Sequence, residues 1–472
     1  MDSQTTEKTT GRSDGSFLRS LEFLADSLLI LLGYYGAFQL RYGFNPDPFN
    51  TEPFYALVPL IGLLAFGVLM FTGSHSGQMS GRMELLLHLT GALLALAVLT
   101  AAAAFALRGF SFPRSVFVIS FALQMVLLYL WKITLMKLRW RRTPRKQTMI
   151  IGPKDEVSGM LAGASGRFHR EFALRYVAGG VNDRVLDGLE DCAAVFLCPG
   201  VSVQERTQIT TACLQRHISV HLVPDLLDVM VRSAPVDIYG DMASLHIEPL
   251  GLSLEKAAVK RALDLTVGGL LLLLAVPLMM AAAVMVLRED GWPVLFRQER
   301  VTRGGRRFTL LKFRTMVKDA EDRCGPVLAS RRDPRVLEVG RMLRDTRIDE
   351  LPQLINVLRG DMSLVGPRPE RPHFVKQYEQ SIPGFGYRLA VKAGITGLAQ
   401  TAGRYATTPR DKLRLDLLYI RSQSLLMDLR ILGTTLQTVL ERNGSAAETV
   451  EPALEDLLAQ AGGILLDVEE QA

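Results

Sequence analysis

The sequence is poor in cysteine, and no cysteine motif could organise a fold. Four cysteines occur among 472 residues, without a CxxC pair or an accompanying histidine spacing: Cys192, Cys198, Cys213 and Cys324. This pattern excludes a disulfide framework and a zinc site as organising features, and it predicts reduced thiols.

Signals for export and for cofactor binding are also missing. The polar start MDSQTTEKTTGRSDGS runs into an apolar segment that is too long for a signal-peptide core and lacks a small-residue cleavage site. No YxxxK pair and no glycine-rich dinucleotide fingerprint occurs, since only Gly159 follows Gly152 nearby. We therefore expect a retained membrane segment and no nicotinamide-dependent sugar chemistry.

What the chain has in abundance is apolar sequence flanked by positive charge. Hydrophobic residues make up 48%, and the formal net charge is +6. Basic residues beside apolar stretches favour anionic lipid headgroups and phosphorylated ligands over nucleic acid. Four stretches approach the ~20 residues that cross a hydrocarbon core, and they predict an N-terminal transmembrane bundle: residues 21–40, 54–71, 85–107 and 116–136.

Charges around these stretches predict the orientation of the bundle. Lysines and arginines precede the first stretch and follow the fourth, which favours an internal location for both ends. Asp26 lies inside the first stretch, where an ionisable group is costly. We expect it to face a neighbouring helix rather than to carry chemistry.

Beyond residue 146 short β-rich runs alternate with helical ones. The runs at residues 148–152, 176–181, 193–200 and 219–224 predict a small parallel α/β domain. Because its phosphate-binding glycines are lost, a structural, regulatory or dimerising module is favoured. A domain that still binds a ligand is the alternative.

A fifth apolar segment, residues 263–287, contains Pro277, which removes a backbone donor and predicts a kink. Positive charge stands on both sides of the segment, so neither flank is marked for export. We expect a re-entrant helix that enters one leaflet and returns. A plain fifth span is the alternative.

Two adjacent acids stand in an arginine-rich stretch further on. Asp349 and Glu350 precede Pro352 and an apolar run, which predicts the first turn of a helix, where backbone amides and the helix dipole favour carboxylate anions. Adjacent helical residues point about 100° apart, so one carboxylate can face a reacting phosphate while the other binds Mg²⁺. Helix capping alone would be the simpler explanation of the pair taken by itself.

The sequence around the pair favours chemistry. It contains the blocks KFRTM at 312–316, DELPQLINVLRGDMSLVGPRP at 349–369, GITGLAQTAGR at 394–404 and KLRLDLLYI at 412–420. With these blocks, the chain from about 254 to 440 resembles the polyprenyl-phosphate hexose-1-phosphate transferases, the monotopic phosphoglycosyltransferases that initiate bacterial surface polysaccharides. Where that family commonly has Arg-Pro-Gly, this chain has Lys392, Ala393 and Gly394, which puts nucleotide or headgroup binding there in question.

The resemblance implies a two-step reaction. The aspartate matching Asp349 attacks the sugar-bearing phosphate of a UDP-sugar and releases UMP, and the covalent phosphosugar then passes to undecaprenyl phosphate. Glu350 matches the magnesium ligand, and Lys312 matches a further catalytic position. Substrate-binding positions are implied for Arg314, Arg344, Arg368, Arg404 and Asp416. The resemblance also implies the bacterial inner membrane, contact with membrane lipid and a catalytic domain on the cytosolic face, and it leaves a homodimer open.

The expected architecture has four parts. A four-span helical bundle covers residues 1–145, and a small Rossmann-like α/β domain covers 146–250. A mainly helical catalytic domain covers 251–445, with its re-entrant helix at about 257–288. The last part, 446–472, contains acids but no lysine or arginine, and we expect a solvated acidic extension or a short helix.

Two other functions compete with the transferase. A membrane-bound nucleotide-sugar dehydratase would need the cofactor motifs that are missing here. A catalytically inactive scaffold for polysaccharide assembly is disfavoured because Asp349 and Glu350 are both intact. The donor sugar stays open, since no motif identifies the walls of a sugar pocket.

Overall fold

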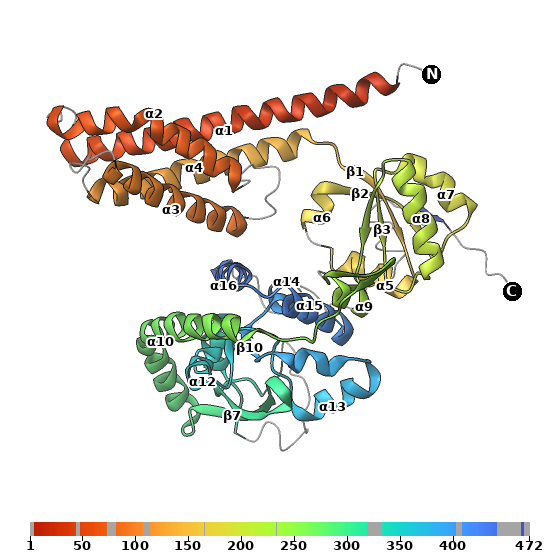
Figure 1. Ribbon diagram of the computed structural model, residues 1–472. Coiled ribbons are helices and arrows are strands. Elements are labelled where there is room, and N and C mark those ends of the chain that lie inside the picture. Colours follow the sequence, from red (N-terminus) through yellow and green to blue (C-terminus); the bar gives the residue numbers. More distant parts are fainter. Residues whose placement is uncertain are drawn as a thin grey trace. The chain divides into compact units, whose positions relative to one another are not determined.

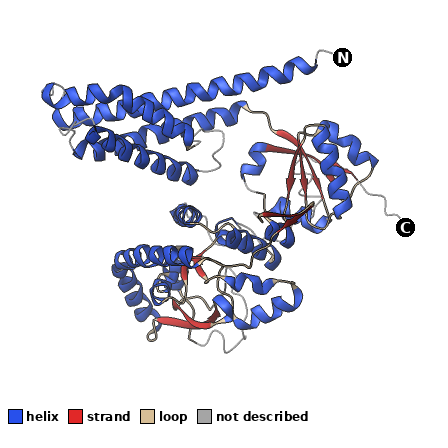
Figure 2. Cartoon of the chain, in the orientation of Figure 1, coloured by secondary structure: helices blue, strands red, loops and turns tan. Residues whose placement is uncertain are grey.

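The computed structural model describes residues 4–43, 48–72, 82–106, 114–164, 166–232, 234–318, 333, 335–402, 408–440 and 464–466. The chain divides into two compact units, Met1–Pro144 and Arg145–Ala472. Within the described residues, the first unit is wholly helical and every strand lies in the second (Figure 2).

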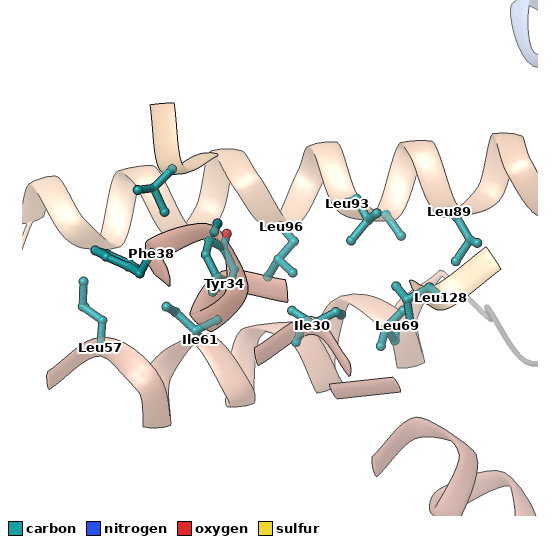
Figure 3. Packing of buried hydrophobic residues seen from close by; sticks show 14 of the residues in the cluster. Ile30, Tyr34, Phe38, Leu57, Ile61, Leu69, Leu89, Leu93, Leu96 and Leu128 are labelled. Carbon is teal, nitrogen blue, oxygen red and sulfur yellow. The ribbon is translucent and has the colours of Figure 1, made fainter. Parts of the chain in front are cut away.

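The first unit is a bundle of four helices. They are α1 (Gln4–Tyr42), α2 (Pro48–Phe71), α3 (Arg82–Ala106) and α4 (Arg114–Arg142). Ile30, Tyr34 and Phe38 recur every four residues on α1 and are buried together with side chains of the other three helices (Figure 3). Large apolar side chains also face outward, and Leu63 is 70% exposed. Helices that are apolar on every side suit a lipid environment.

Length and composition identify the helices that can cross a membrane. In the described part of the chain these are α1 from Ser20 to Tyr42, α3, α4 and α10 (Leu254–Asp290). The described apolar part of α2, Leu57–Phe71, is shorter. The predicted apolar helices are thus present, and the second carries the weakest signal.

Asp26 lies in a buried cluster of charges inside the bundle. Lys132 of α4 is fully buried and donates to Glu22 at 2.7 Å and to Asp26. Arg139 donates to the other oxygen of Glu22 at 2.6 Å. The prediction that Asp26 faces a neighbouring helix is confirmed, because its partner is on α4 and buried charges require such pairing.

The second unit begins with a parallel sheet covered by helices on both faces. Its elements are β1 (Lys146–Ile151), α5 (Lys154–Ala162), α6 (Gly166–Glu171), β2 (Phe172–Ala178), α7 (Asp183–Gly188), η1 (Leu189–Asp191), β3 (Ala194–Leu197), α8 (Val203–Gln215), β4 (Ser219–Leu222) and α9 (Leu226–Val231). Met149 and Ile151 pack toward α7 and α8, whereas Ile150 packs toward α5 and α6 (Figure 1). The predicted parallel α/β sheet is confirmed, with the order β11-β2-β1-β3-β4, in which β11 is Ile464–Leu466. Cys192, Cys198 and Cys213 are buried free thiols.

The described residues of the C-terminal tail form a strand and not the expected solvated extension or short helix. Ile464–Leu466 form β11, which pairs in parallel with β2 at the edge of the sheet. Leu465 and Leu466 pack against the cores on the two faces of the sheet. Three consecutive apolar residues explain the strand, and the surrounding acids hid this signal.

The remainder of the second unit is mainly helical, as predicted. After the hairpin of β5 (Val236–Tyr239) and β6 (Met242–Leu245) come α10, β7 (Leu295–Val301), η2 (Arg303–Gly305), β8 (Arg307–Phe313), α11 (Glu338–Asp345), η3 (Ile348–Glu350), α12 (Gln353–Arg359), β9 (Ser363–Val365), α13 (Pro372–Ser381), η4 (Phe385–Ala390), β10 (Gly394–Thr396), α14 (Leu398–Ala402), α15 (Pro409–Arg421) and α16 (Leu425–Leu440). Side chains of β8, α12, β9 and α15 share one core. This core supports the site described below.

Helix α10 contains Pro277 and is bent along its length (Figure 1). Near its start, Arg261 donates to the carbonyl oxygens of Val357 and Leu358 at 2.7 and 2.8 Å. Near its end, Glu289 accepts from two backbone N–H groups at the start of α11, at 2.7 and 3.0 Å. A straight helix of this length would separate its ends by about 55 Å. The bend lets both ends contact one compact domain.

Helix α15 also contacts the α/β sheet. Arg414, whose side chain is 7% exposed, donates to both carboxylate oxygens of Glu156 at 3.1 Å and to Asp411 at 2.7 Å. Glu156 lies in the first turn of α5, directly after β1. In parallel sheets ligands bind at this carboxyl edge. Here basic side chains of α15 contact it, which suits a structural role for the domain.

Replacing Arg414 should loosen this contact. Arg414→Ala leaves Glu156 without its bidentate partner. We expect the free energy of unfolding to fall by on the order of 3 kcal/mol, which would lower the midpoint of thermal unfolding in detergent. Arg410→Ala is the matched control, because Arg410 is 50% exposed and lies 3.4 Å or more from its acidic partners. Equal shifts of the unfolding midpoint in the two variants would contradict a special role of Arg414 in this contact.

Candidate active site

The adjacent acids lie in a tight turn between two helices. Helix α11 ends at Asp345, Arg347 then adopts a left-handed conformation with φ of 59°, and Asp349 and Glu350 follow in η3. Helix α12 starts only at Gln353, with Pro352 as its N-cap. The acids therefore precede this helix instead of forming its first turn.

Asp349 is a buried carboxylate. Asp349 is 8% exposed. Its Oδ1 has no hydrogen-bond partner among the described residues. Burial, and then repulsion from Glu350, raise the pKa of Asp349 to about 6, against the attraction of Lys312 and Arg344. The group is ionised at neutral pH and one oxygen is free to bind or to attack.

Glu350 has the opposite environment. Burial would raise the pKa of Glu350, but the Arg368 guanidinium, which donates to its Oε1 at 2.9 Å, brings the pKa below its usual value. Arg347 lies 3.9 Å from the same oxygen. Environments that push two neighbouring pKa values apart are typical of acids with separate roles.

Lys312 is the cation that the β7–β8 hairpin contributes. The hairpin turns through Gly304 and Gly305, both with positive φ, a conformation that suits glycine. Lys312 stands opposite Phe296, and its Nζ lies 4.9 Å from the centre of that ring. Burial and nearby arginines lower the pKa of Lys312 to about 8, whereas Asp349 acts in the other direction.

Arg344 is held in place by a residue that follows strand β8. It lies in the last turn of α11, and its Nε donates to the buried hydroxyl of Thr315 at 2.9 Å. Its charge acts on Asp349 and lowers the pKa of that carboxyl. The structure therefore brings Lys312, Arg344 and Arg368 around the two acids.

Asp416 belongs to the support behind Arg368. It is 2% exposed and pairs at 2.8 Å with the buried Arg388, which also donates to the backbone oxygen of Arg368 at 2.9 Å. Burial raises the pKa of Asp416 to about 6, against the attraction of Arg388. Sequence reasoning missed Arg388, since its partners are distant in the chain.

Arg314 and Arg404 complete the predicted set. Arg314 follows β8 by one residue and is buried beside the end of α10. Arg404 lies outside the described residues. Pro277 lies within α10 and does not take part in the cluster of charges.

Two further contacts fix the loops around the acids. Asp264 of α10 is 2% exposed and accepts from the hydroxyl of Ser363 and the N–H of Leu364, both at 2.9 Å. In the segment that departs from the family pattern, the Ala393 N–H donates to Thr302, a bond that a proline there could not make. A side chain at Gly394 would come 2.1 Å from the nitrogen of Gly366, so this glycine is required.

The two acids fit a magnesium ion. Mg²⁺ prefers hard oxygen ligands and is commonly held by one or two carboxylates together with substrate phosphates. Asp349 supplies a buried oxygen without a hydrogen-bond partner, and Glu350 is adjacent to it. No group of three or more His, Cys, Asp or Glu suited to a metal occurs among the described residues. An ion here would therefore depend on phosphate oxygens for its remaining ligands.

Taken together, the second unit combines an apolar, bent helix with a buried carboxylate among cations, as expected of a protein that handles phosphate at a membrane. Residues 255–442 match the sequence profile of the family described as "Bacterial sugar transferase". This chain belongs to that family, which confirms the resemblance found in the sequence.

Relatives with named activities show the same relationship. A UDP-N-acetylgalactosamine-undecaprenyl-phosphate N-acetylgalactosaminephosphotransferase from Aeromonas hydrophila is 38% identical over 239 residues, 49% of this chain and 55% of that protein. An undecaprenyl-phosphate glucose phosphotransferase from Komagataeibacter xylinus is 35% identical over 333 residues, 64% of this chain and 60% of that protein. A UDP-glucose:undecaprenyl-phosphate glucose-1-phosphate transferase from Caulobacter vibrioides is 39% identical over 257 residues, 53% of this chain and 93% of that protein.

Removing the Asp349 charge should stabilise the fold. Its pKa in the folded chain, about 6, lies above the ordinary 3.8, so the protonated carboxyl favours the fold and this contribution is lost as pH rises from 3.8 through 6. At pH 8 the ionised group destabilises the fold by up to about 3 kcal/mol. Asp349→Asn should therefore raise the midpoint of thermal unfolding, more at pH 8 than at pH 5. The exposed Asp345→Asn is the control, and a lower midpoint for Asp349→Asn would refute the prediction.

Proposed function

We propose that this protein transfers a sugar phosphate from a UDP-sugar to undecaprenyl phosphate and releases UMP. The observation that carries the proposal is the buried Asp349 carboxylate, which has an oxygen without a hydrogen-bond partner and lies near Lys312 and Arg344. The names of the relatives give the same class of reaction, with N-acetylgalactosamine in one and glucose in two others. The donor sugar is for experiment to determine. The reaction would start the assembly of an exopolysaccharide, capsule or O-antigen unit.

In the first step, an ionised oxygen of Asp349 attacks the phosphorus that bears the sugar. The bond from this phosphorus to the bridging oxygen of the diphosphate breaks, and UMP leaves with the electron pair. Lys312 and Arg344, whose charges act on Asp349, offset the oxyanion charge that develops. The product is an aspartyl phosphosugar.

In the second step, an oxygen of the lipid phosphate attacks the same phosphorus. The bond to Asp349 breaks, which restores the carboxylate and leaves the sugar on a lipid diphosphate. No electron donor is required in either step. Glu350, fixed by Arg368, would hold Mg²⁺ at the diphosphate, where the ion would supply positive charge to the reacting phosphates.

We also propose that α10 enters and leaves the membrane on one face, the cytosolic face of the bacterial inner membrane. The contacts of Arg261 and Glu289 with one compact domain support this, because a spanning helix would carry its ends to opposite sides. The site would then lie beside the lipid headgroups, where a soluble nucleotide sugar and a lipid phosphate can both reach it.

Asp349→Asn should abolish the reaction. The amide is a poor nucleophile, so UMP release from UDP-sugars by the purified full chain, with Mg²⁺ and undecaprenyl phosphate, should fall by at least about 10³-fold. Asp345→Asn, at an exposed position, should behave like the unaltered chain. Activity that survives in Asp349→Asn would refute the nucleophile, and an inactive unaltered chain would favour the scaffold.

The two ends of α10 should be accessible from the same side of the membrane. Glu255→Cys and Arg288→Cys each place a thiol at an exposed position at one end of the helix, in a chain that also carries Cys324→Ser. An impermeant maleimide should label both thiols in inverted vesicles and neither in right-side-out vesicles. Labelling of the two positions from opposite sides would show a plain span.

A further inference from the structure

An open pocket of about 620 Å³ lies beyond the C-terminal end of α10. Its walls combine apolar and cationic side chains, and they are formed by Trp292, Pro293, Val294, Leu295, Phe296, Arg297, Arg314 and Lys318. Trp292 is 71% exposed directly after an apolar helix, a position that suits the membrane interface. The pocket is therefore open to a ligand with both apolar and anionic parts.

Arg314 is the unusual member of this set. Its side chain is 5% exposed, and Nη2 donates to the backbone oxygens of Asp290 and Gly291 at 2.9 and 2.7 Å. The other two nitrogens, Nε and Nη1, are buried and have no hydrogen-bond partner among the described residues. Buried N–H groups of a charged side chain are seldom left unsatisfied, so a ligand with acceptor oxygens is expected.

The charges of the pocket define the anion that fits. Arg297, Arg314 and Lys318 are cationic, and Asp290, 3.1 Å from Arg314, offsets one of these charges. The two remaining positive charges match a phosphate monoester, which carries close to two negative charges at pH 7, better than the single charge of a phosphodiester. Nε and Nη1 can each donate a separate hydrogen bond to a phosphate oxygen, because Nη2 is already occupied by the two carbonyl groups.

The pocket adjoins the proposed reaction centre. Phe296 lines the pocket and also lies against Lys312, whose charge acts on Asp349. Arg314 follows Lys312 by two residues, and its neighbour Thr315 holds Arg344. A phosphate bound at Arg314 would thus be separated from Lys312 by the side chain of Phe296.

We propose that this pocket holds the phosphate of the polyprenyl phosphate acceptor, with Arg314 as its main ligand and the apolar wall from Trp292 to Phe296 along the first part of the lipid chain. The proposal rests on the proposed function and names the acceptor subsite of that reaction. Bilayer phospholipids offer a related headgroup, and the experiment separates the two sources.

The test measures the two half-reactions separately in full-length protein in nanodiscs. Exchange of labelled UMP into a UDP-sugar without acceptor reports the first step, and transfer to undecaprenyl phosphate reports both. Arg314→Lys keeps the charge but loses the separate Nε and Nη1 donors, so the apparent KM for undecaprenyl phosphate should rise about tenfold, while exchange changes less than about twofold. Arg307→Gln is the matched control on the same hairpin, since Arg307 is 58% exposed and pairs only with the exposed Glu299 in the described structure.

The outcomes separate the two proposals. An unaltered chain without UMP exchange would refute the proposed function, whatever the Arg314 variants do. Normal UMP exchange together with an unchanged KM for undecaprenyl phosphate in Arg314→Lys and Arg314→Gln would overturn the proposal of an acceptor subsite. Equal losses of exchange and transfer, in variants with unchanged thermal unfolding, would assign Arg314 to the donor and also overturn it. A KM effect that disappears in purely zwitterionic nanodiscs would assign the pocket to anionic phospholipid instead.

Discussion

Two neighbouring carboxylates have different environments, and the rest of the site depends on this difference. Asp349 is buried with one oxygen unpartnered, whereas Glu350 is neutralised by Arg368 at 2.9 Å. Two bare carboxylates side by side would repel each other and favour protonation of one. Lys312, Arg344 and Arg347 lower the pKa of Asp349 against the effects of burial and of Glu350, so Asp349 can stay ionised near neutral pH. The two acids therefore differ in charge environment although they are adjacent in the chain.

The different environments of the two acids are maintained by contacts that extend away from them. Arg368 is held through its backbone oxygen by Arg388, and Arg388 is fixed by Asp416 on α15. The same helix presents Arg414 to Glu156 of the α/β domain. The α/β domain is thus linked to the active site through one helix. This link gives it a mechanical reason to be present even though its phosphate-binding glycines are lost.

Local patterns in the sequence predicted the parts of the structure that local chemistry determines. The parallel sheet and the apolar helices follow from periodicity, and the resemblance to a known family pointed to Lys312, Arg344 and Arg368 beside the two acids. Partnerships across the chain were not accessible in this way. Asp264 bonds residues about a hundred positions away, and no local pattern marks Arg388 as the partner of Asp416.

The bend in α10 decides which parts of the chain meet in one domain. A straight helix of its length would separate its ends by about 55 Å, so the contacts of Arg261 with α12 and of Glu289 with α11 depend on the bend. The second half of the same helix packs against Phe313 and so supports the β7–β8 hairpin, which carries Lys312. Arg314 is fastened to the last carbonyl groups of α10 itself. The bent helix therefore helps to position two cations of this domain, Arg314 directly and Lys312 through the β7–β8 hairpin.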